Sequence, residues 1–343
     1  MFNSKPPYAS YFSKEEYPII EAIHNKDKET LRNMMKQSWN INSRGKEGMT
    51  YLEYTVFTDN YKMTEFLLEN GADPNLLSLV DPNDRYGPEG MLPLSSACHS
   101  KHSIKFVKLL IKYGANINDD RAPLPIFSAA LSNDKQKIEY LLKHGADINK
   151  LQDGFNTVIT DEATAGAWPM VLWLWDKGAD PNLLSKLVTP DGKRTKNALP
   201  IESACYSKHN IKFLKLLIKY GANVNDDQAL LPIFKAALSD DKRKIEYLLE
   251  HGADVNKLQK GFRTVITAEA TAGKWSMVLW LWDKGADPMK TGEDETNVAV
   301  WIQERIDGTG LTEDGECVKA RLESIGVKFP YRPVRKNRVK SDE

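Results

Sequence analysis

The sequence predicts an all-α fold in which pairs of helices stack side by side as a solenoid. The phrase Gly-Ala-Asp/Asn-x-Asn keeps returning, and its glycines are Gly71, Gly114, Gly145, Gly178, Gly221, Gly252 and Gly285. The steps between them are 43, 31, 33, 43, 31 and 33 residues, and a period near 33 is the signature of a helical repeat array. Because three unequal steps occur twice, we expect a duplicated three-repeat block, with residues 76–182 and 183–289 as its copies.

Composition limits the classes of function. Lys and Arg together number 47, as do Asp and Glu, so the formal net charge is zero. A neutral chain argues against a general binder of nucleic acid or of anionic membranes. Three cysteines do not make a disulfide framework, and Cys98 and Cys205 hold the same position in the two copies. No run reaches the roughly 18 apolar residues of a membrane span, so we expect no direct membrane insertion.

The start of the chain does not have the pattern of a secretory signal. Residues 1–11 contain Pro6 and Pro7 and no apolar stretch. We therefore expect a cytoplasmic protein as the sequence stands, or a periplasmic lipoprotein if a leader was removed. We also expect a monomer when no partner is bound.

Four regions are expected along the chain. Residues 1–14 are predicted to form a flexible arm, and residues 15–289 to hold about eight repeats. Residues 290–328 are predicted to form a helical cap, because the last unit of a solenoid would otherwise expose an apolar face. Residues 329–343 are basic and interrupted by proline, which is typical of a disordered tail.

Residues 43–75 show the repeat unit most plainly. Thr50 is expected to open a first helix, and a turn follows at Asp59. Met63 and Phe66 mark the apolar face of a second helix at helical spacing. Gly71 then ends that helix in the left-handed conformation that glycine adopts at little cost.

Four later repeats open with Leu-Pro in place of the threonine. The leucines are Leu92, Leu124, Leu199 and Leu231. Proline suits the first turn of a helix, where its missing N–H has no partner to lose. Leucine has no hydroxyl to cap the helix, so we expect burial of the leucine to take the place of capping.

These residues resemble the ankyrin repeat, whose pattern opens with Thr-Pro-Leu-His and closes with Gly-Ala-Asp-x-Asn. The resemblance covers about residues 15–290. It implies an ankyrin-repeat solenoid whose helix pairs are joined by β-hairpin loops, with first helices and hairpins lining a concave face. It also implies a non-enzymatic module for protein–protein interaction.

No motif in the sequence points to catalysis, to a cofactor or to a metal. Cys-x-x-Cys, His-Glu-x-x-His, phosphate-loop and Gly-x-Ser-x-Gly patterns are all missing. His144 and His251 precede terminating glycines, where a cation complements the end of a helix. The acid pair that begins at Asp119, and its copy at Asp226, fits a solvated turn better than an acid/base couple.

Two hairpins are longer than the rest, at residues 76–91 and 183–198. We expect them to form two extended hairpin fingers. Residues 80–89 carry a charge of minus two and residues 188–197 a charge of plus two. Long loops on a rigid scaffold often bind partners, and opposite charges would fix the register of an asymmetric partner. Neutral drift in a loop is the alternative.

The two copies can also be compared position by position. Exchanges that change charge are expected to fall on the concave side, and tryptophans at helix entries are expected either to anchor a partner or to pack under the next repeat. The predicted partner-binding residues are Asp84, Arg85, Tyr86 and Glu89 of the first finger; Lys193, Arg194 and Lys196 of the second; and Ser95, Ser128, Asp161, Trp168, Glu202, Lys235, Lys260, Arg263 and Trp275.

Four other tryptophans lie on the same second helices. Trp175 and Trp282 replace the second leucine of the usual Leu-Leu pair, which favours packing in the core. Trp173 and Trp280 lie two residues earlier and are expected to face outward.

A narrower resemblance concerns residues 11–23, Tyr-Phe-Ser-Lys-Glu-Glu-Tyr-Pro-Ile-Ile-Glu-Ala-Ile, and residues 45–50, Gly-Lys-Glu-Gly-Met-Thr. These segments are similar to bacterial ankyrin proteins found with type VI secretion lipase effectors. The similarity implies an immunity protein that binds one folded partner, a phospholipase-type toxin, and blocks it. The alternative is a scaffold or host-directed effector that links two proteins.

Overall fold

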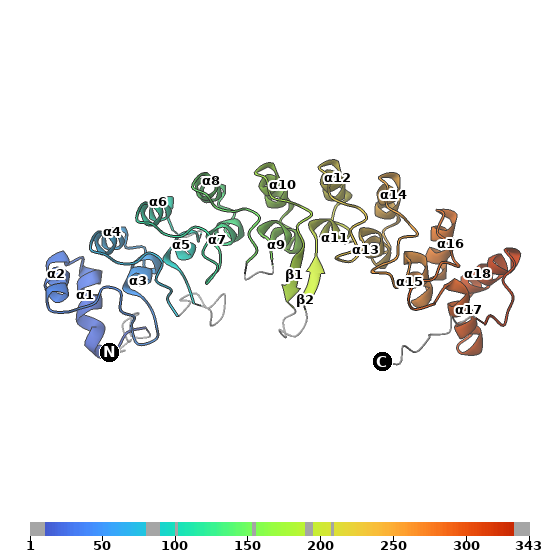
Figure 1. Ribbon diagram of the computed structural model, residues 1–343, viewed down its shortest axis with the longest axis horizontal. Coiled ribbons are helices and arrows are strands. Elements are labelled where there is room, and N and C mark those ends of the chain that lie inside the picture. Colours follow the sequence, from blue (N-terminus) through green and yellow to red (C-terminus); the bar gives the residue numbers. More distant parts are fainter. Residues whose placement is uncertain are drawn as a thin grey trace, which may run out of the picture. The chain divides into compact units, whose positions relative to one another are not determined.

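The computed structural model describes residues 11–79, 90–99, 102–152, 156–188, 195–206 and 209–332. The chain divides into two compact units. Unit 1 consists of Met1–Glu162 and Pro169–Ala179, and unit 2 consists of Ala163–Trp168 and Asp180–Glu343. Pairs of helices make up both units, so the predicted all-α class of stacked helix pairs is confirmed (Figure 1).

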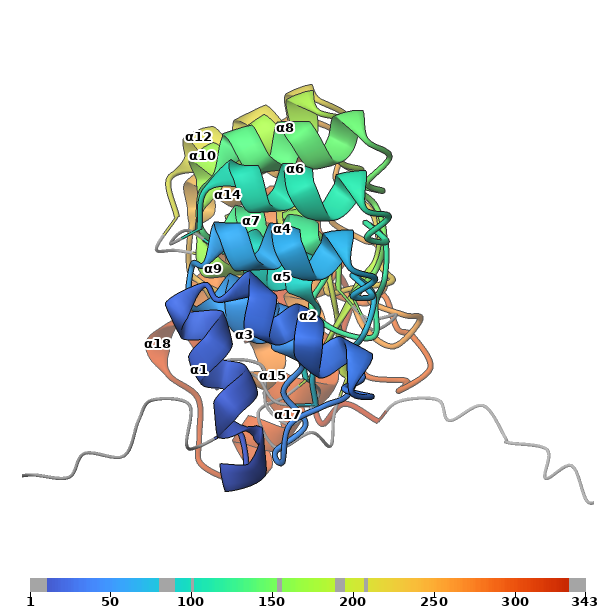
Figure 2. The same ribbon diagram turned by 90° about the vertical axis from the view of Figure 1, so that its left-hand side faces the viewer.

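Unit 1 begins with a short 3₁₀ turn and continues through paired helices. Its elements are η2 (Lys14–Glu16), α1 (Tyr17–Asn25), α2 (Lys28–Lys36), α3 (Tyr51–Phe57), α4 (Tyr61–Glu69), α5 (Pro93–Ala97), α6 (Ile104–Lys112), α7 (Pro125–Leu131) and α8 (Lys135–Lys143). The first helices α3, α5 and α7 pack in one row, and the second helices α4, α6 and α8 pack in another. Figure 2 shows α4, α6 and α8 running side by side. Helices α9 (Val158–Ala165) and α10 (Trp168–Asp176) belong in part to each unit.

Unit 2 repeats this pattern and adds a two-stranded hairpin. Its elements are β1 (Ser185–Val188), β2 (Thr195–Ala198), α11 (Pro200–Ala204), α12 (Ile211–Lys219), α13 (Pro232–Leu238), α14 (Lys242–Glu250), α15 (Val265–Thr271), α16 (Trp275–Asp283), α17 (Val298–Asp307) and α18 (Glu313–Ser324). Strands β1 and β2 are antiparallel, with Ser185 opposite Ala198 and Val188 opposite Thr195. Helices α17 and α18 follow the last repeat and bury Val298, Ile302, Val318 and Leu322.

The recurrent Gly-Ala-Asp/Asn-x-Asn phrase links each repeat to the next. All seven of its glycines have positive φ, near +90°, as helix ends of this type require. The final asparagine then bridges to the following phrase. The side chain of Asn75, for example, donates to the Gly114 carbonyl at 3.0 Å and accepts from the Asn116 amide at 2.7 Å. Asn42, Asn118, Asn182, Asn225 and Asn256 make the same pair of bonds.

Helix openings are satisfied in two ways. Thr50 caps α3, because its hydroxyl accepts from the Glu53 amide at 3.0 Å. Where leucine replaces threonine, the leucine is buried as expected at all four positions. In two of these repeats a glutamine of the next hairpin also contributes. Gln152 Oε1 accepts from the Leu124 amide at 2.6 Å, and Gln259 does the same for Leu231 at 2.7 Å.

The described part of the expected N-terminal arm is not loose. Phe12 is buried and stacks on the Tyr51 ring at 5.4 Å, and it meets the Tyr54 ring edge-on at 5.3 Å. A Cβ at Gly45 would lie 2.4 Å from the Phe12 ring, so only glycine fits beside it. Within the predicted flexible arm at 1–14, Phe12 is thus packed against the first repeat, and residues 1–10 lie outside the described part.

Candidate protein-binding surface

The two long hairpins are described only at their bases. Ser78 and Met91 pair as an antiparallel bridge at the base of the first. Strands β1 and β2 form the stem of the second, and the Asn197 side chain joins that stem to the Gln228 carbonyl at 2.5 Å. The predicted residues Asp84, Arg85, Tyr86, Glu89, Lys193 and Arg194 lie outside the described residues, as does the side chain of Lys196.

Six of the other predicted contact residues are buried within the repeats, namely Ser95, Ser128, Trp168, Glu202, Lys235 and Trp275. The charge exchanges among them are matched inside the molecule. Lys235 Nζ on α13 lies 3.7 Å from Glu202 Oε1 on α11, where the first copy has Ser128 and Ser95. Because the two charges compensate each other, their divergence needs no external partner. These six side chains are therefore largely buried within the repeats, where we had expected them on an exposed face.

The exchanges near the hairpins follow the same rule. Arg263, half-buried, pairs with Asp294 at 3.2 Å, whereas its counterpart Asn156 donates to Asp161 at 2.9 Å. Burial raises the pKa of the half-buried Asp161, and the Asn156 hydrogen bond opposes that rise. Among the described candidates, Lys260 alone is exposed.

Trp168 packs under the next repeat instead of facing solvent. Its indole Nε1–H donates to His209 Nδ1 at 3.1 Å, and its ring stacks on Phe213 with centroids 4.9 Å apart. Trp275 is likewise buried, and a Cβ at Gly315 would lie 3.3 Å from its Nε1. Of the two alternatives expected for Trp168 and Trp275, both residues therefore pack under the next repeat.

Lysines cover the aromatic side chains of the second helices. Trp173 is half-buried, with Lys135 Nζ 5.3 Å and Lys177 Nζ 5.1 Å from its ring centroid. Lys242 and Lys284 cover Trp280 in the same manner, at 5.6 and 5.2 Å. Such contacts stabilise by about 0.5–1 kcal/mol at exposed sites. The outward-facing tryptophans are therefore occupied by the protein's own cations.

Trp175 and Trp282 depart from the expectation. Both are half-buried, so the predicted core position is wrong. The Arg321 guanidinium lies 4.4 Å from the Trp282 ring centroid. The indole ring, larger than a leucine side chain, extends to the helix surface and is covered there by a side chain from α18.

In each unit, most of the exposed large apolar side chains lie outside the second helices. Among described residues before α17, large apolar side chains are exposed at Leu79, Leu131, Tyr206, Tyr220, Leu238 and Phe262. All but Tyr220 belong to hairpins or to the ends of first helices. We call these five positions, within their respective units, the first-helix and hairpin surface. Isolated exposed leucines are ordinary. Here, however, the exposed large apolar side chains lie mainly on hairpins and first-helix ends, and only Tyr220 lies at the end of a second helix.

Phe262 is the aromatic residue of this surface that lies in a hairpin, and contacts on both sides brace that hairpin. It is 51% exposed, in the hairpin closed by the Gln259–Arg263 bridge. The preceding Gly261 carbonyl accepts from the Glu293 amide at 3.0 Å. A Cβ at Gly292 would lie 2.0 Å from the Phe262 carbonyl oxygen. Only glycine therefore allows the backbone at residue 292 to approach the hairpin backbone this closely. The counterpart hairpin tip at 153–155 lies outside the described residues.

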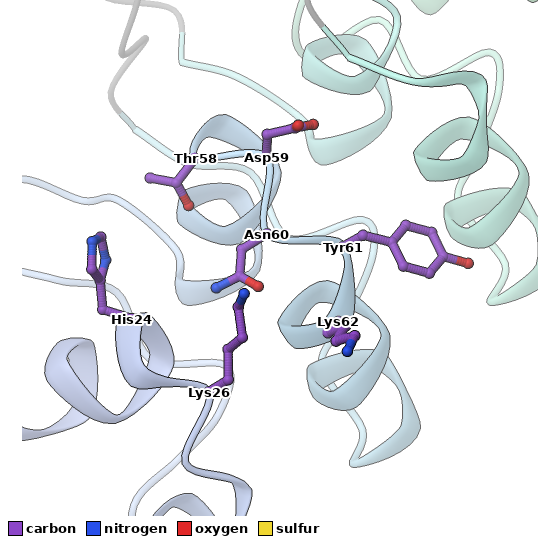
Figure 3. A pocket seen from close by; sticks show the side chains of 7 residues that line it. All are labelled: His24, Lys26, Thr58, Asp59, Asn60, Tyr61 and Lys62. Carbon is purple, nitrogen blue, oxygen red and sulfur yellow. The ribbon is translucent and has the colours of Figure 1, made fainter.

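A polar pocket of about 360 Å³ lies in unit 1, at the turns between helices. Figure 3 shows Lys26 reaching toward Asn60, while Tyr61 points away from both. The Asn60 side chain donates to the Ile23 carbonyl at 3.1 Å, and Asp59 lies 3.4 Å from His102 Nδ1. The remaining lining residues are His24, Thr58 and Lys62. These groups serve the fold and include no nucleophile paired with a base.

Two buried lysines escaped the sequence-based prediction. Lys137 Nζ donates to the His99 carbonyl at 2.6 Å, just beyond the end of α5. Lys244 donates in the same way to the Tyr206 carbonyl beyond α11. A cation suits the carbonyl end of a helix, even though burial lowers the pKa of Lys244. The available signal was a lysine placed identically in both copies, next to the apolar Ile138 and Ile245.

Reactive or metal-binding groups are not prominent. Burial raises the pKa of the Cys98 and Cys205 thiols to about 12, which leaves them as unreactive core residues. The described residues hold no group of three or more His, Cys, Asp or Glu side chains placed to bind a metal ion. Within the same residues, no helix combines the length and apolar character needed to cross a membrane.

Comparison with known proteins places these observations in a family. The model of ankyrin repeats (3 copies) matches residues 75–152 and 162–259, just over half of the chain. Human transient receptor potential cation channel subfamily A member 1 is 24% identical over 78% of this chain and 24% of its own length. Ankyrin repeat protein nuc-2 of Neurospora crassa is 30% identical over 44% of this chain and 13% of its own.

A viral protein and a solved structure are also similar to this chain. Ankyrin repeat protein OPG189 of variola virus is 24% identical over 63% of this chain and 40% of its own length. The chain therefore spans less than half the length of these curated relatives. The crystal structure of the human ASB11 ankyrin repeat domain is 21% identical, with a TM-score of 0.49, over 69% of this chain and 98% of that one.

Proposed function

Because this chain belongs to the ankyrin-repeat family, we propose that it holds one folded protein partner against its first-helix and hairpin surface. Ankyrin repeats make it a protein-interaction module, and we propose that it has no catalytic activity of its own. One observation carries the choice of surface. Exposed apolar side chains lie on hairpins and first-helix ends, whereas lysines cover the tryptophans of the second helices.

Rigidity supports this role. The asparagine bridges between repeats and the Gly292 brace hold the hairpins before any partner arrives. A preorganised surface loses little conformational entropy on binding. Full burial of a phenylalanine side chain contributes about 1.5–3 kcal/mol, so Phe262 is the residue we expect to contribute most in unit 2.

The partner we propose is a secreted bacterial toxin of the phospholipase type, which the chain would neutralise as an immunity protein. Support comes from the similarity of residues 11–23 and 45–50 to such proteins. Those segments meet where the Glu47 amide donates to the Tyr11 carbonyl at 3.3 Å, and Tyr51, the residue after the second segment, donates from its Oη to Glu16 at 3.1 Å. Inhibition would follow from occlusion of the toxin's active site or membrane-facing surface.

Affinity capture from the native organism tests both the proposed binding surface and the proposed identity of the partner. The tagged chain would be compared with Phe262→Ala, and with Tyr220→Ala as a matched control at the C-cap of the second helix α12. We expect one stoichiometric lipase with the wild type and the control, and less of it with Phe262→Ala. Capture of several unrelated proteins would favour a scaffold that links partners and would contradict the immunity role. Equal capture by all three variants would contradict the proposed surface.

A further inference from the structure

A second pocket, of about 320 Å³, lies in unit 2 at the turns between helices, away from the hairpins. Asp240 lines it from the turn between α13 and α14, and Trp275 and Ser276 line it from the start of α16. Thr312 and Asp314 complete it from the start of α18. The volume is at the lower end of the range of ligand pockets, which suits a single long side chain.

Trp168, the counterpart of Trp275 in the first copy of the block, has a hydrogen-bond acceptor that Trp275 lacks. Trp168 donates its indole N–H to His209, the residue before the α12 N-cap, and stacks on Phe213. The α18 N-cap is Thr312, so the matching positions hold Leu311 and Gly315. Neither side chain can accept a hydrogen bond. Duplication has thus left Trp275 without the acceptor that its counterpart has.

The indole of Trp275 is consequently an unused donor. The residue is only 4% exposed, yet it lines the pocket. Across the described ranges, its Nε1–H has no hydrogen-bond acceptor. The Nε1 atom itself is not sealed from solvent, so an acceptor brought by a ligand would take the place of water at this donor.

Two carboxylates that line the pocket, those of Asp240 and Asp314, favour a ligand with positive charge. Asp240 and Asp314 are exposed, and neither forms an ion pair with another described residue. Lys274 also lines the pocket, but it pairs with Glu269 at 3.3 Å. Thr312 Oγ1 accepts from the Gly315 amide at 3.3 Å. The groups that remain are two anionic acceptors, the Ser276 hydroxyl and one indole donor.

We infer that this pocket binds a basic side chain of a protein partner, with its cation paired to Asp240 and Asp314 and an adjoining peptide carbonyl accepting from Trp275. Charge-assisted hydrogen bonds to carboxylates are roughly twice as strong as neutral ones. A bare metal ion would leave the indole donor unused, whereas a lysine or arginine within a peptide offers both a cation and a carbonyl. The pocket shares no lining residue with the first-helix and hairpin surface.

The test uses the full chain labelled with ¹⁵N and follows the tryptophan indole resonances during titration with N-acetyl-arginine amide. The neutral isostere N-acetyl-citrulline amide is the control ligand. Trp275→Phe assigns the Trp275 signal, and the Trp168 signal serves as an internal reference because His209 already accepts its proton. We expect the arginine ligand to shift the Trp275 resonance, and the citrulline ligand to shift it at least about tenfold less at equal concentration.

Two variants decide the part played by the carboxylates. The double variant Asp240→Asn with Asp314→Asn should weaken arginine binding at least about tenfold, which corresponds to about 1.4 kcal/mol. Glu316→Gln, an exposed acid on the same turn of α18 but outside the pocket, should bind as the wild type does. A Trp275 signal that does not respond to arginine, that responds equally to citrulline, or that responds unchanged in the double variant would overturn the inference.

Discussion

Lys274 Nζ lies 3.3 Å from Glu269 Oε2 in unit 2, and the earlier copy has Ala167 where this lysine stands. Its Glu162 is buried without such a partner. Burial, reinforced by the adjacent Asp161 charge, raises the pKa of Glu162 from 4.5 to about 7. Two copies of one repeat therefore differ in how they accommodate the same carboxyl group.

A pH dependence of stability follows from Glu162. Between about pH 4.5 and 7 the folded state holds a proton that the unfolded state has lost, so the free energy of unfolding should fall as pH rises through this window. After allowance for solvent screening, we expect a loss of about 1–2 kcal/mol. Urea unfolding of wild type and Glu162→Gln at pH 5 and pH 8 measures it. The Gln variant should lose less stability over this interval, and parallel curves would contradict the assignment.

Ala167→Lys should supply the missing cation. It copies the arrangement at Glu269, where Lys274 opposes the rise in carboxyl pKa that burial causes. We expect the variant to gain stability at pH 8 relative to wild type by up to about 1 kcal/mol, and to show little change at pH 5. The same urea titrations at both pH values check this, with Ala167→Met as a control for chain length without charge.

The Glu202–Lys235 pair predicts a coupled pair of substitutions. Glu202→Ser alone leaves Lys235 buried without its carboxylate, which should cost about 3–5 kcal/mol as for other broken buried pairs. Glu202→Ser combined with Lys235→Ser recreates the serines that the first copy carries, and should recover most of that loss. A double-mutant cycle by urea unfolding gives the coupling energy. Additive losses would show that the two charges act independently.

The asparagine bridges should also be measurable one at a time. Asn225 donates to the Gly252 carbonyl at 2.7 Å and accepts from the Asp254 amide at 2.9 Å. Asn225→Ala removes both bonds, and at about 0.5–1.5 kcal/mol each we expect a loss of about 1–3 kcal/mol in thermal or urea unfolding. Asn225→Asp keeps the acceptor and loses the donor, so its loss should be smaller. No difference between the two variants would argue against the bridging role.

Local pattern was sufficient to predict most of the fold. The period of the Gly-Ala-Asp/Asn-x-Asn phrase placed the helix ends, because a glycine such as Gly114 and its positive φ belong to one short segment. The family resemblance supplied the pairing of helices. The stem at β1 and β2 also fell where the longer hairpin was predicted.

The contact residues were harder to predict because burial depends on the neighbouring repeat. Trp168 is buried by residues 41 or more positions away in sequence, and Lys235 meets Glu202 only after α11 and α13 have packed. Comparison of the copies showed that charge had changed, but not that the changes at Glu202, Lys235 and Arg263 were matched internally. Phe262 was not singled out from the sequence because the close approach of Gly292 to its backbone is not revealed by any local pattern.

Affinity for the captured partner tests the central claim most directly. Isothermal titration would compare wild type, Phe262→Ala and Tyr220→Ala, after thermal unfolding shows that all three melt within a few degrees of one another, as expected for exposed positions. If the partner rests on the first-helix and hairpin surface, Phe262→Ala should raise Kd at least about tenfold, or about 1.4 kcal/mol, while Tyr220→Ala leaves it unchanged. The reverse order, or equal affinities, would contradict the account.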